Sequence, residues 1–433
     1  MRWVYKAAEE YCESVRDGTH DTPKQTEFGY RLVTGKHIKN GQIDPSDAYY
    51  ISEKDYTKIN ERSLVEQWDV LMSMIGTVGE VAVVQDVPNY AIKNVALFKC
   101  GGSEVRGKWL AYYLRSSEAQ GHMMGHQKGS SQQFLSLKQL RSLPIPVTDV
   151  EYMQKVVDIL SAYDNLIENN QNQIKLLEEA AQRLYKEWFV DLRFPGYENT
   201  PIIDGIPQGW KDGTLGEIAF FKRGKTITKD QTCEGMVPVV AGGLEPAYYH
   251  NQSNTASPVI TVSGSGANAG FTRMYHTEVW ASDCSFVDPQ NTDNIYFAYC
   301  VLKNKKSDID SLQKGAAQPH VYAKDINALE ILVPDSLCLA EFENLVTPFF
   351  EKIKSLYQQI ELSKEARDRL LPKLMSGEID LSDGKQAEIL QFPQKLSYDE
   401  FLSELGMAAR AKSISDADLR AMYEAYLDDD ATE

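Results

Sequence analysis

The feature that most constrains this chain is a long apolar seam that occurs twice. Between Val156 and Trp188, apolar residues recur at alternating spacings of four and three, as in a helix that packs lengthwise against another helix. The same register returns 186 residues later, between Phe342 and Leu374. Residues beside the seam repeat at this offset as well, such as Arg183-Leu184 with Arg369-Leu370. The sequence therefore predicts a tandem repeat with two long helices.

The repeat divides the 433 residues into two globules, each followed by one of these helices. Both globules mix short strand-like runs, glycine-bearing turns and a helical segment, which predicts an α+β fold. In the first, residues 70–75 and 81–84 flank Gly76-Thr77-Val78-Gly79 and predict a hairpin. The expected parts are a first globule (1–150), a first long helix (151–193), a linker (194–213), a second globule (214–338), a second long helix (339–384) and an acidic tail with one short helix (385–433).

Three features bear on the helices themselves. Phe194-Pro195-Gly196 should end the first helix, because proline cannot continue it. Pro348 is expected to kink the first turns of the second helix, and Pro372 lies near its end. Asn170 is the lone polar residue of the first seam; it either fixes the helix register or faces solvent near the middle of the helix.

Charge and cysteine content bound the function. The net charge of -17 argues against tight DNA binding by this chain alone, although residues 1–150 hold 18 basic and 18 acidic residues. The six cysteines form no C-x-x-C pair, so we expect buried, reduced thiols rather than disulfides or a zinc site. We find neither an apolar run long enough to span a bilayer nor a secretory signal, which predicts a cytoplasmic protein.

Catalytic motifs are missing from the sequence. There is no phosphate-binding G-x-x-x-x-G-K-[ST] loop and no Asn/Asp-Pro-Pro-Tyr/Phe motif of adenine methyltransferases. Gly264-Ser265-Gly266 fits a hairpin turn better than a phosphate loop. His122 and His126 are spaced for a metal but lack a third ligand, and Asp383-Gly384-Lys385 fits a solvated turn. We therefore predict no catalytic residue and no metal site.

Several segments together resemble one protein family. Residues 181–191, from Ala181 to Asp191, with Phe194-Pro195-Gly196, and residues 370–379 resemble the central and C-terminal conserved regions of specificity subunits of type I restriction-modification systems. Residues 17–23 (Asp-Gly-Thr-His-Asp-Thr-Pro) resemble a segment near the start of their first target recognition domain. The likeness covers residues 1–384, and the acidic tail departs from it.

The resemblance implies a non-catalytic DNA-reading subunit. Each globule would be a target recognition domain that reads one half of a bipartite, asymmetric double-stranded DNA target. The two helices would pair antiparallel, hold the domains apart in a pseudo-twofold arrangement and dock two methyltransferase subunits, which restriction/translocase subunits join. S-adenosylmethionine, ATP and Mg²⁺ would then bind to the partner subunits and not to this chain.

The length of the helices agrees with this. About 33 helical residues at about 1.5 Å each make a rod of roughly 50 Å. One turn of DNA is roughly 34 to 36 Å long. Two readers on such a rod could therefore meet one side of the DNA about a turn apart.

Candidate DNA contacts come from polar loops and from the start of each globule. Arg and Lys suit guanine, Asn and Gln suit adenine, and hydroxyl groups suit phosphate. Two matching loops, residues 127–132 and 313–318, offer such side chains. An ordinary solvated surface residue is the alternative for every candidate. The candidates are Thr19, His20, Thr22, Lys36, Lys39, Lys128, Ser130, Ser131, Gln132, Lys222, Arg223, Lys225, Lys314, Gln318 and His320.

Two other functions remain as alternatives. A coiled-coil scaffold or adaptor without DNA readout would explain the helices and the acidic balance, but not two divergent globules in a repeated frame. A self-sufficient methyltransferase or nuclease is disfavoured by the missing motifs.

Overall fold

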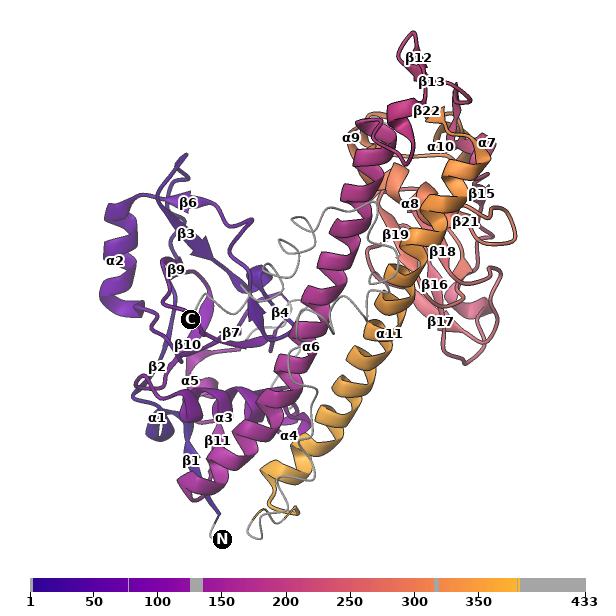
Figure 1. The fold of residues 1–433 in the computed structure, drawn as a ribbon. Coiled ribbons are helices and arrows are strands. Elements are labelled where there is room, and N and C mark those ends of the chain that lie inside the picture. Colours follow the sequence, from indigo (N-terminus) through magenta and orange to yellow (C-terminus); the bar gives the residue numbers. More distant parts are fainter. Residues whose placement is uncertain (1–2, 77, 125–134, 315–318, 380, 382–433) are drawn as a thin grey trace. The chain divides into compact units, whose positions relative to one another are not determined.

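The computed structural model describes residues 3–76, 78–124, 135–314, 319–379 and 381. In this part the chain forms two compact units, one of residues up to 168 together with those from 360 on, the other of residues 169–359. Each unit holds one globule and one half of each long helix, which Figure 1 colours by sequence.

The first globule is built from four small sheets. A four-stranded sheet has the order β2-β10-β7-β8, a three-stranded sheet has the order β6-β3-β9, and β1 pairs with β11. Strand β3 runs parallel to β9, whereas the other pairs are antiparallel. The elements are β1 (Val4–Ala7), α1 (Ala8–Tyr11), β2 (Ser14–Asp17), β3 (Tyr30–Val33), β4 (Ile38–Lys39), β5 (Gln42–Ile43), β6 (Tyr50–Ile51), α2 (Glu53–Ser63), β7 (Val70–Ser73), β8 (Val81–Val83), β9 (Tyr90–Ile92), β10 (Val95–Lys99), α3 (Glu104–Arg115), α4 (Ser117–Met124), α5 (Leu137–Arg141) and β11 (Pro144–Val147).

The second globule repeats three of these sheets, but not the β4–β5 pair. Its four-stranded sheet has the order β15-β21-β18-β19, its three-stranded sheet the order β17-β16-β20 with β16 parallel to β20, and β14 pairs with β22. The elements are β12 (Ile202–Ile203), β13 (Ile206–Pro207), β14 (Lys211–Thr214), α7 (Leu215–Ile218), β15 (Lys222–Arg223), β16 (Val237–Val240), β17 (Tyr248–His250), β18 (Val259–Ser263), β19 (Thr272–Tyr275), β20 (Trp280–Ala281), β21 (Cys284–Val287), α8 (Ile295–Asn304), α9 (Lys306–Ser311), α10 (Ala323–Asn327) and β22 (Glu330–Val333).

The two predicted hairpins are confirmed. Strand β7 pairs antiparallel with β8 across the first glycine-bearing turn. Strand β18 pairs antiparallel with β19, and Gly264-Ser265-Gly266 lies in their connection. The glycines therefore serve a turn, as their spacing indicated.

The two long helices pack together and run antiparallel. Helix α6 (Val150–Tyr185) continues as a π-helical turn, Lys186–Val190, and α11 spans Ser336–Met375. In the first unit the Tyr152 hydroxyl near the start of α6 donates to the Leu374 carbonyl near the end of α11, at 3.0 Å. In the second unit Trp188, late in the chain's first helix, packs edge-on against Phe342 at 5.9 Å. The predicted α+β fold with two antiparallel long helices is thus confirmed.

A residue with a left-handed backbone conformation follows the C-terminal end of each long helix. Leu192 has φ 57° after the π-helical turn, just before Phe194-Pro195-Gly196, and Gly377 has φ 75° after α11. Helix α11 is one unbroken element through Pro348 and Pro372, so neither proline ends it. The predicted acidic tail, 385–433, and the segment Asp383-Gly384-Lys385 lie outside the described residues.

Asn170 lies in the seam and not on the solvent side. Its side chain is 2% exposed, and its amide donates to the side-chain amide oxygen Oε1 of Gln359 at 3.3 Å. The solvent-facing interpretation is therefore wrong, and a role in helix register is consistent with the burial.

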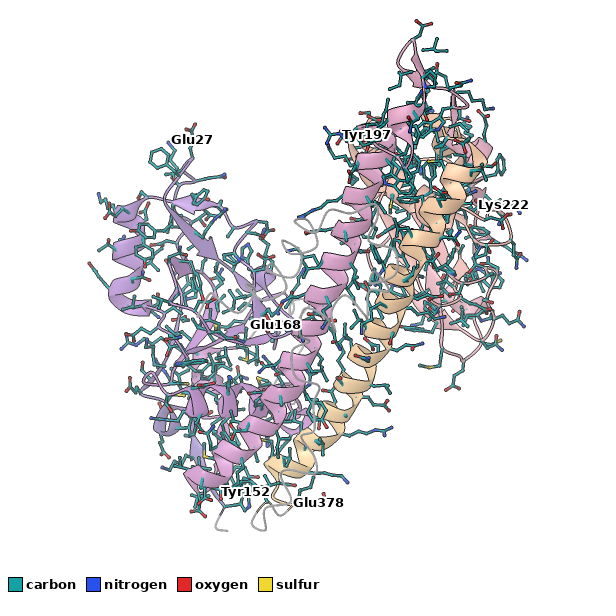
Figure 2. The ribbon with its side chains drawn as sticks, viewed as in Figure 1. Glu27, Tyr152, Glu168, Tyr197, Lys222 and Glu378 are labelled. Carbon is teal, nitrogen blue, oxygen red and sulfur yellow. The ribbon has the colours of Figure 1, made fainter. Side chains whose placement is uncertain are left out.

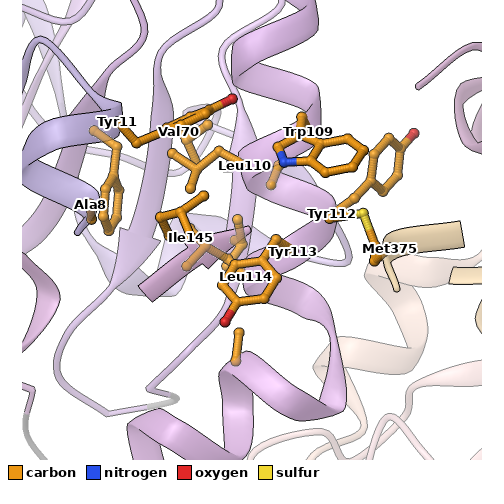
Figure 3. Packing of buried hydrophobic residues seen from close by; sticks show 14 of the residues in the cluster. Ala8, Tyr11, Val70, Trp109, Leu110, Tyr112, Tyr113, Leu114, Ile145 and Met375 are labelled. Atoms are coloured by element: carbon orange, nitrogen blue, oxygen red, sulfur yellow. The ribbon is translucent and has the colours of Figure 1, made fainter. Parts of the chain in front are cut away.

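The core of the first unit joins α3 to the helix pair. Trp109, Leu110, Tyr113 and Leu114 of α3 are at most 1% exposed, and their cluster includes Met375 of α11, as Figure 3 shows. The Trp109 indole satisfies its one donor by bonding the Pro146 carbonyl at 2.8 Å. The first globule is consequently held on the helices by continuous apolar packing.

Cysteine environments match the expectation except at one position. Five of the free cysteines are buried, but Cys233 is exposed. Its turn precedes β16, where no core covers it, so a free thiol at the surface corrects the expectation of six buried ones. No helix in the described part of the chain is long and apolar enough to cross a membrane.

Candidate nucleic-acid interface

The chain leaves β2 and β15 in the same way. These are equivalent strands at the edges of the two four-stranded sheets, and the residues that follow them are called the first and second edge. The Gly18 N–H after β2 donates to the Val95 carbonyl at 2.9 Å, and the Gly224 N–H after β15 donates to the Cys284 carbonyl at 2.8 Å. A Cβ at Gly18 would lie 2.4 Å from the Ile92 carbonyl oxygen, and one at Gly224 equally close to a carbonyl. Both edges therefore require glycine. The residues that follow, Thr19 and Lys225, occupy equivalent places.

Polar side chains gather at the first of these edges. The exposed His20 ring contacts the Asn94 amide oxygen through Nδ1 at 2.8 Å and the Asp17 carboxylate through Nε2 at 2.9 Å. Beside it, Lys93 donates to the Thr22 hydroxyl at 2.5 Å. The structure thus brings the candidates His20 and Thr22 together with an amide and a lysine.

The second edge carries different side chains on the same backbone. The Arg223 guanidinium lies 4.0 Å from the Asp283 carboxylate, to which the Ser265 hydroxyl also donates. The Trp280 indole donates to the Lys225 carbonyl at 2.8 Å. Lys222 is exposed and labelled in Figure 2. Lys222 and Arg223 form β15, and Lys225 follows after Gly224.

Lys314 and His320, on either side of residues 315–318, lie near the β18–β19 connection. Lys314 and His320 exchange two backbone hydrogen bonds of 3.0 and 2.9 Å, and His320 also forms a β-bridge with Ser265. The Lys314 ammonium pairs with Asp325 at 2.8 Å. The His320 ring stacks on Tyr322 with a centroid separation of 5.9 Å. Lys314 and His320 are therefore near the Ser265 turn.

Five candidates cannot be placed. Lys128, Ser130, Ser131 and Gln132 of the first polar loop, and Gln318 of the second, lie outside the described residues. That the two polar loops have similar structures therefore stays a prediction.

Lys36 and Lys39 lie three residues apart in the chain, in the segment that leads into and includes β4. Lys36 pairs with the Asp47 carboxylate at 2.9 Å, which lowers the pKa of that carboxyl group. The buried His37 ring lies 3.1 Å from the same carboxylate, and burial lowers its pKa. Lys39 is exposed, and no ion pair or hydrogen bond of its side chain occurs among the described residues.

The two edges carry different polar side chains. Asp17 precedes Gly18, whereas Arg223 precedes Gly224. The Val95 and Cys284 carbonyls accept the hydrogen bonds from these two glycines. The residue before Val95 is Asn94, an amide, and the residue before Cys284 is Asp283, a carboxylate. The motif search singled out neither Asn94 nor Asp283, because each follows a short strand whose pairing is not visible in the sequence. The same backbone frame thus carries a buried carboxylate, paired with Arg62, in the first globule and an exposed arginine beside a carboxylate in the second.

Metal ligands do not gather in the described part of the chain: no group of three or more His, Cys, Asp or Glu side chains is placed to hold an ion there. Of the histidine pair considered above, His122 is described and His126 is not.

Comparison with known proteins gives a consistent family. Residues 3–179 and 207–337 match the model of the type I restriction modification DNA specificity domain. The chain is 27% identical over 423 residues to the type I restriction enzyme MjaIX specificity subunit of Methanocaldococcus jannaschii, covering 88% of this chain and 94% of that one. It is 21% identical over 406 residues to the HindI specificity subunit of Haemophilus influenzae, covering 73% and 88%.

A solved structure has the same fold. The S subunit of a type I restriction-modification system from M. genitalium aligns with a TM-score of 0.51 at 19% identity, covering 86% of this chain and 96% of that one.

Proposed function

Because the chain belongs to the DNA specificity subunits of type I restriction-modification systems, we propose that each of its two globules reads one half of a bipartite, asymmetric DNA target. As such a subunit it is a non-catalytic component of the enzyme. The two target recognition domains are taken as residues 1–150 and 214–338.

One observation carries the proposal. Both globules build the same three sheets in the same strand order, yet the equivalent edges after β2 and β15 carry the exposed His20 beside Asn94 in one and the exposed Arg223 beside Asp283 in the other. A carboxylate accepts from cytosine, an amide pairs with adenine, and arginine pairs with guanine. A shared frame with unlike polar side chains is what two readers of unlike half-sites need.

The helices supply the distance between half-sites. Helix α6 has 36 residues and α11 has 40. At about 1.5 Å per residue these lengths are roughly 54 and 60 Å, longer than one DNA turn of roughly 34 to 36 Å. In the proposal this pair acts as the spacer between the domains and as the dock for two methyltransferase subunits.

Candidate contacts are assigned by residue type. Within the described residues, the exposed Lys39 and Lys222 are free to reach bases or phosphates, whereas the Lys225 ammonium lies 6.0 Å from the centroid of the Trp280 ring. Arg223, Lys314 and His320 are assigned to the second edge. Thr19, His20 and Thr22 line the first edge. The undescribed loop candidates Lys128, Ser130, Ser131, Gln132 and Gln318 are kept as proposed contacts on sequence grounds.

The net charge of -17 sets a requirement for partners. Phosphate contacts dominate DNA affinity, and an acidic chain offers few of them. The proposal therefore assigns much of the DNA-binding surface to methyltransferase subunits, which would also bind S-adenosylmethionine. Restriction/translocase subunits would bind ATP and Mg²⁺.

Domain replacement tests the proposal. Residues 1–150 are replaced by the first recognition domain of a relative, and the host genome is mapped for methylated adenine by long-read sequencing. We expect one half of the bipartite motif to change, while the other half and the spacer stay the same because residues 151–433 are retained. A motif altered in both halves, or in neither, would contradict the proposal.

The scaffold alternative predicts a different outcome. If this chain bound only protein, deleting its gene would leave every methylated motif of the host in place. Loss of one bipartite motif on deletion supports DNA readout.

A further inference from the structure

A short hairpin of the first globule has a rigid turn. Strands β4 and β5 pair Ile38 with Ile43 and Lys39 with Gln42, leaving Asn40 and Gly41 as a two-residue loop. Their φ angles are 53° and 86°. Two consecutive positive φ angles at Asn-Gly define a type I′ turn, the turn whose twist matches a tight hairpin.

The hairpin is anchored at its base and exposed at its tip. Ile38 is fully buried, and Ile43 packs against the same core cluster as Leu71 and Leu97. Lys39, Asn40 and Gln42 are all exposed. Lysine pairs with guanine, and asparagine or glutamine with adenine, so the tip carries side chains of the types that read bases in a groove.

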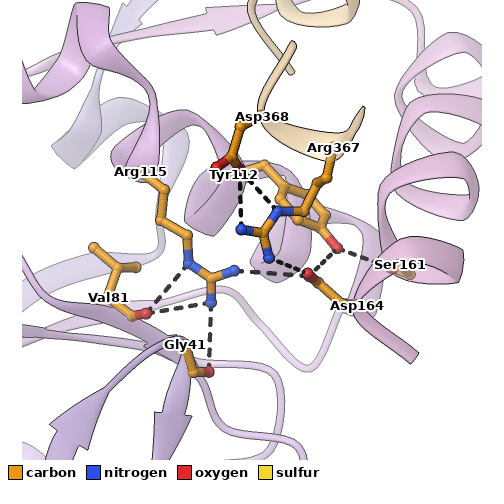
Figure 4. Close-up of polar contacts among 8 residues, drawn as sticks. All are labelled: Gly41, Val81, Tyr112, Arg115, Ser161, Asp164, Arg367 and Asp368. Carbon is orange, nitrogen blue, oxygen red and sulfur yellow. Dashed lines mark hydrogen bonds and ion pairs between the residues drawn. The ribbon is translucent and has the colours of Figure 1, made fainter. Parts of the chain in front are cut away.

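Arg115 holds the hairpin from behind, as Figure 4 shows. Its guanidinium donates through Nε and Nη2 to the Val81 carbonyl of β8, at 3.3 and 3.2 Å, and through Nη2 to the Gly41 carbonyl at 3.4 Å. A Cβ at Gly41 would lie 2.6 Å from Nη2. The turn therefore sits directly against this side chain.

The same arginine is tied to both long helices within the first unit. Its Nη1 lies 3.7 Å from the Asp164 carboxylate of α6. That carboxylate also accepts from the Tyr112 hydroxyl at 2.8 Å and from Arg367 of α11 at 2.7 Å. Asp164 and Arg367 are 30% and 25% exposed, so water screens the network only partly. One planar guanidinium thus joins the hairpin turn to the helix pair.

The second globule has no such hairpin. It is described without a gap from β16 to β17, and residues 241–247 between them form no strand. An element present in one reader and absent from the other is a natural source of difference between two half-sites.

We propose that the β4–β5 hairpin is a base-reading element of the first recognition domain, and that Arg115 is the positioning residue that fixes it relative to the long helices. This inference rests on the proposed function. It assigns Lys39, Asn40 and Gln42 to bases of the half-site read by residues 1–150.

Lys39→Ala tests the reading role, with Lys58→Ala as its matched control. Lys58 is an exposed lysine of α2 in the same globule, and its side chain likewise makes no ion pair or hydrogen bond within the described part of the chain. The complete methyltransferase complex is assayed on DNA libraries that vary one base at a time in each half-site. Lys39→Ala should relax discrimination roughly tenfold at one or two positions of the first half-site, whereas Lys58→Ala should not. Equal weakening on all sequences, with a smaller salt slope, would mean a phosphate contact and would overturn the reading role.

Arg115→Lys tests the positioning role, with Arg369→Lys as its control. Lysine keeps the charge near Asp164 but cannot span two carbonyls and a carboxylate at once. Arg369 pairs only with Glu365 of its own helix in the described residues. Arg115→Lys should relax the first half-site at the positions affected by Lys39→Ala and leave the second half-site unchanged. Unchanged discrimination, or equal relaxation in both half-sites, would overturn it.

The outcomes separate this inference from the function beneath it. If domain replacement changes one half-site but both hairpin variants read as wild type, only the hairpin assignment fails. If domain replacement changes neither half-site, the proposed function and the hairpin assignment both fail.

Discussion

Asn170→Leu should stabilise the helix pair. The side chain is 2% exposed in an otherwise apolar seam and makes one hydrogen bond of 3.3 Å, to Gln359. The position one repeat later in the chain is Leu356, which is buried. The substitution therefore places in α6 the residue that α11 already carries there.

The magnitude follows from two opposing terms. Burying a leucine side chain contributes about 1.5 to 3 kcal/mol. The lost hydrogen bond costs about 0.5 to 1.5 kcal/mol, at the lower end because Gln359 is exposed and can bond to water. The net gain is about 1 to 2 kcal/mol, which for a unit of this size raises Tm by roughly 2 to 8 °C.

Thermal unfolding of the purified chain, followed by circular dichroism at 222 nm, measures this. Gln171→Leu is the control, because Gln171 is the next residue of α6 and is exposed, so the same leucine gains little burial there. A Tm that falls in Asn170→Leu would refute the reasoning, since it would mean that the amide contributes more than a single long hydrogen bond.

Two further predictions concern single side chains. Burial raises the pKa of Glu343, whose carboxylate accepts from the Phe297 N–H at 2.7 Å, to about 7. Because the pKa of Glu343 is higher in the folded chain than in the unfolded chain, its protonated form stabilises the fold at pH values below about 4.5. This contribution is lost as the pH rises through 7. Glu343→Gln, which mimics the protonated form, should therefore exceed wild-type stability at pH 8 by about 3 kcal/mol and match it below pH 4.5 in denaturant titrations; parallel pH profiles would contradict this. Gly377→Ala should destabilise more than Gly205→Ala, because both glycines have positive φ but a Cβ at Gly377 would also lie 2.7 Å from the Trp3 indole nitrogen; equal Tm losses would show that Trp3 gives way without cost.

The apolar seam could be predicted because helix packing requires apolar residues at spacings of three and four, and this spacing is visible within the sequence of a single helix. The same holds for the β7–β8 and β18–β19 hairpins, whose strands are close in sequence. Pairing between distant strands leaves no such mark: β1 bonds to β11, across residues 8–143, and β15 has only two residues. The topology of the three sheets that the two globules share was therefore not predicted.

The repeat itself is more extensive than the constant offset suggests. Trp3 and Trp210 precede β1 and β14, which are equivalent strands, but they lie 207 residues apart rather than 186. Insertions in the first globule change the offset, so a search at one spacing misses the pair. The β4–β5 hairpin is one such difference, and its Asn40-Gly41 dipeptide was the available signal.

Site residues were predicted by type rather than by position. Lysines and histidines at the strand edges were identified, whereas Asn94, Asp283 and Arg115 were not, because their partners His20, Arg223 and Gly41 are more than fifty residues away. Only the folded chain brings these groups together.

The reciprocal domain replacement tests the central claim most directly. Residues 214–338 are exchanged for the second recognition domain of a relative, and the methylated motif is compared with that of the 1–150 exchange. The account predicts that the two exchanges alter opposite halves of the motif and that both keep the spacer length, because both retain α6 and α11. If the two exchanges altered the same half, or if either changed the spacer, the division into two independent readers on a fixed helical spacer would be contradicted.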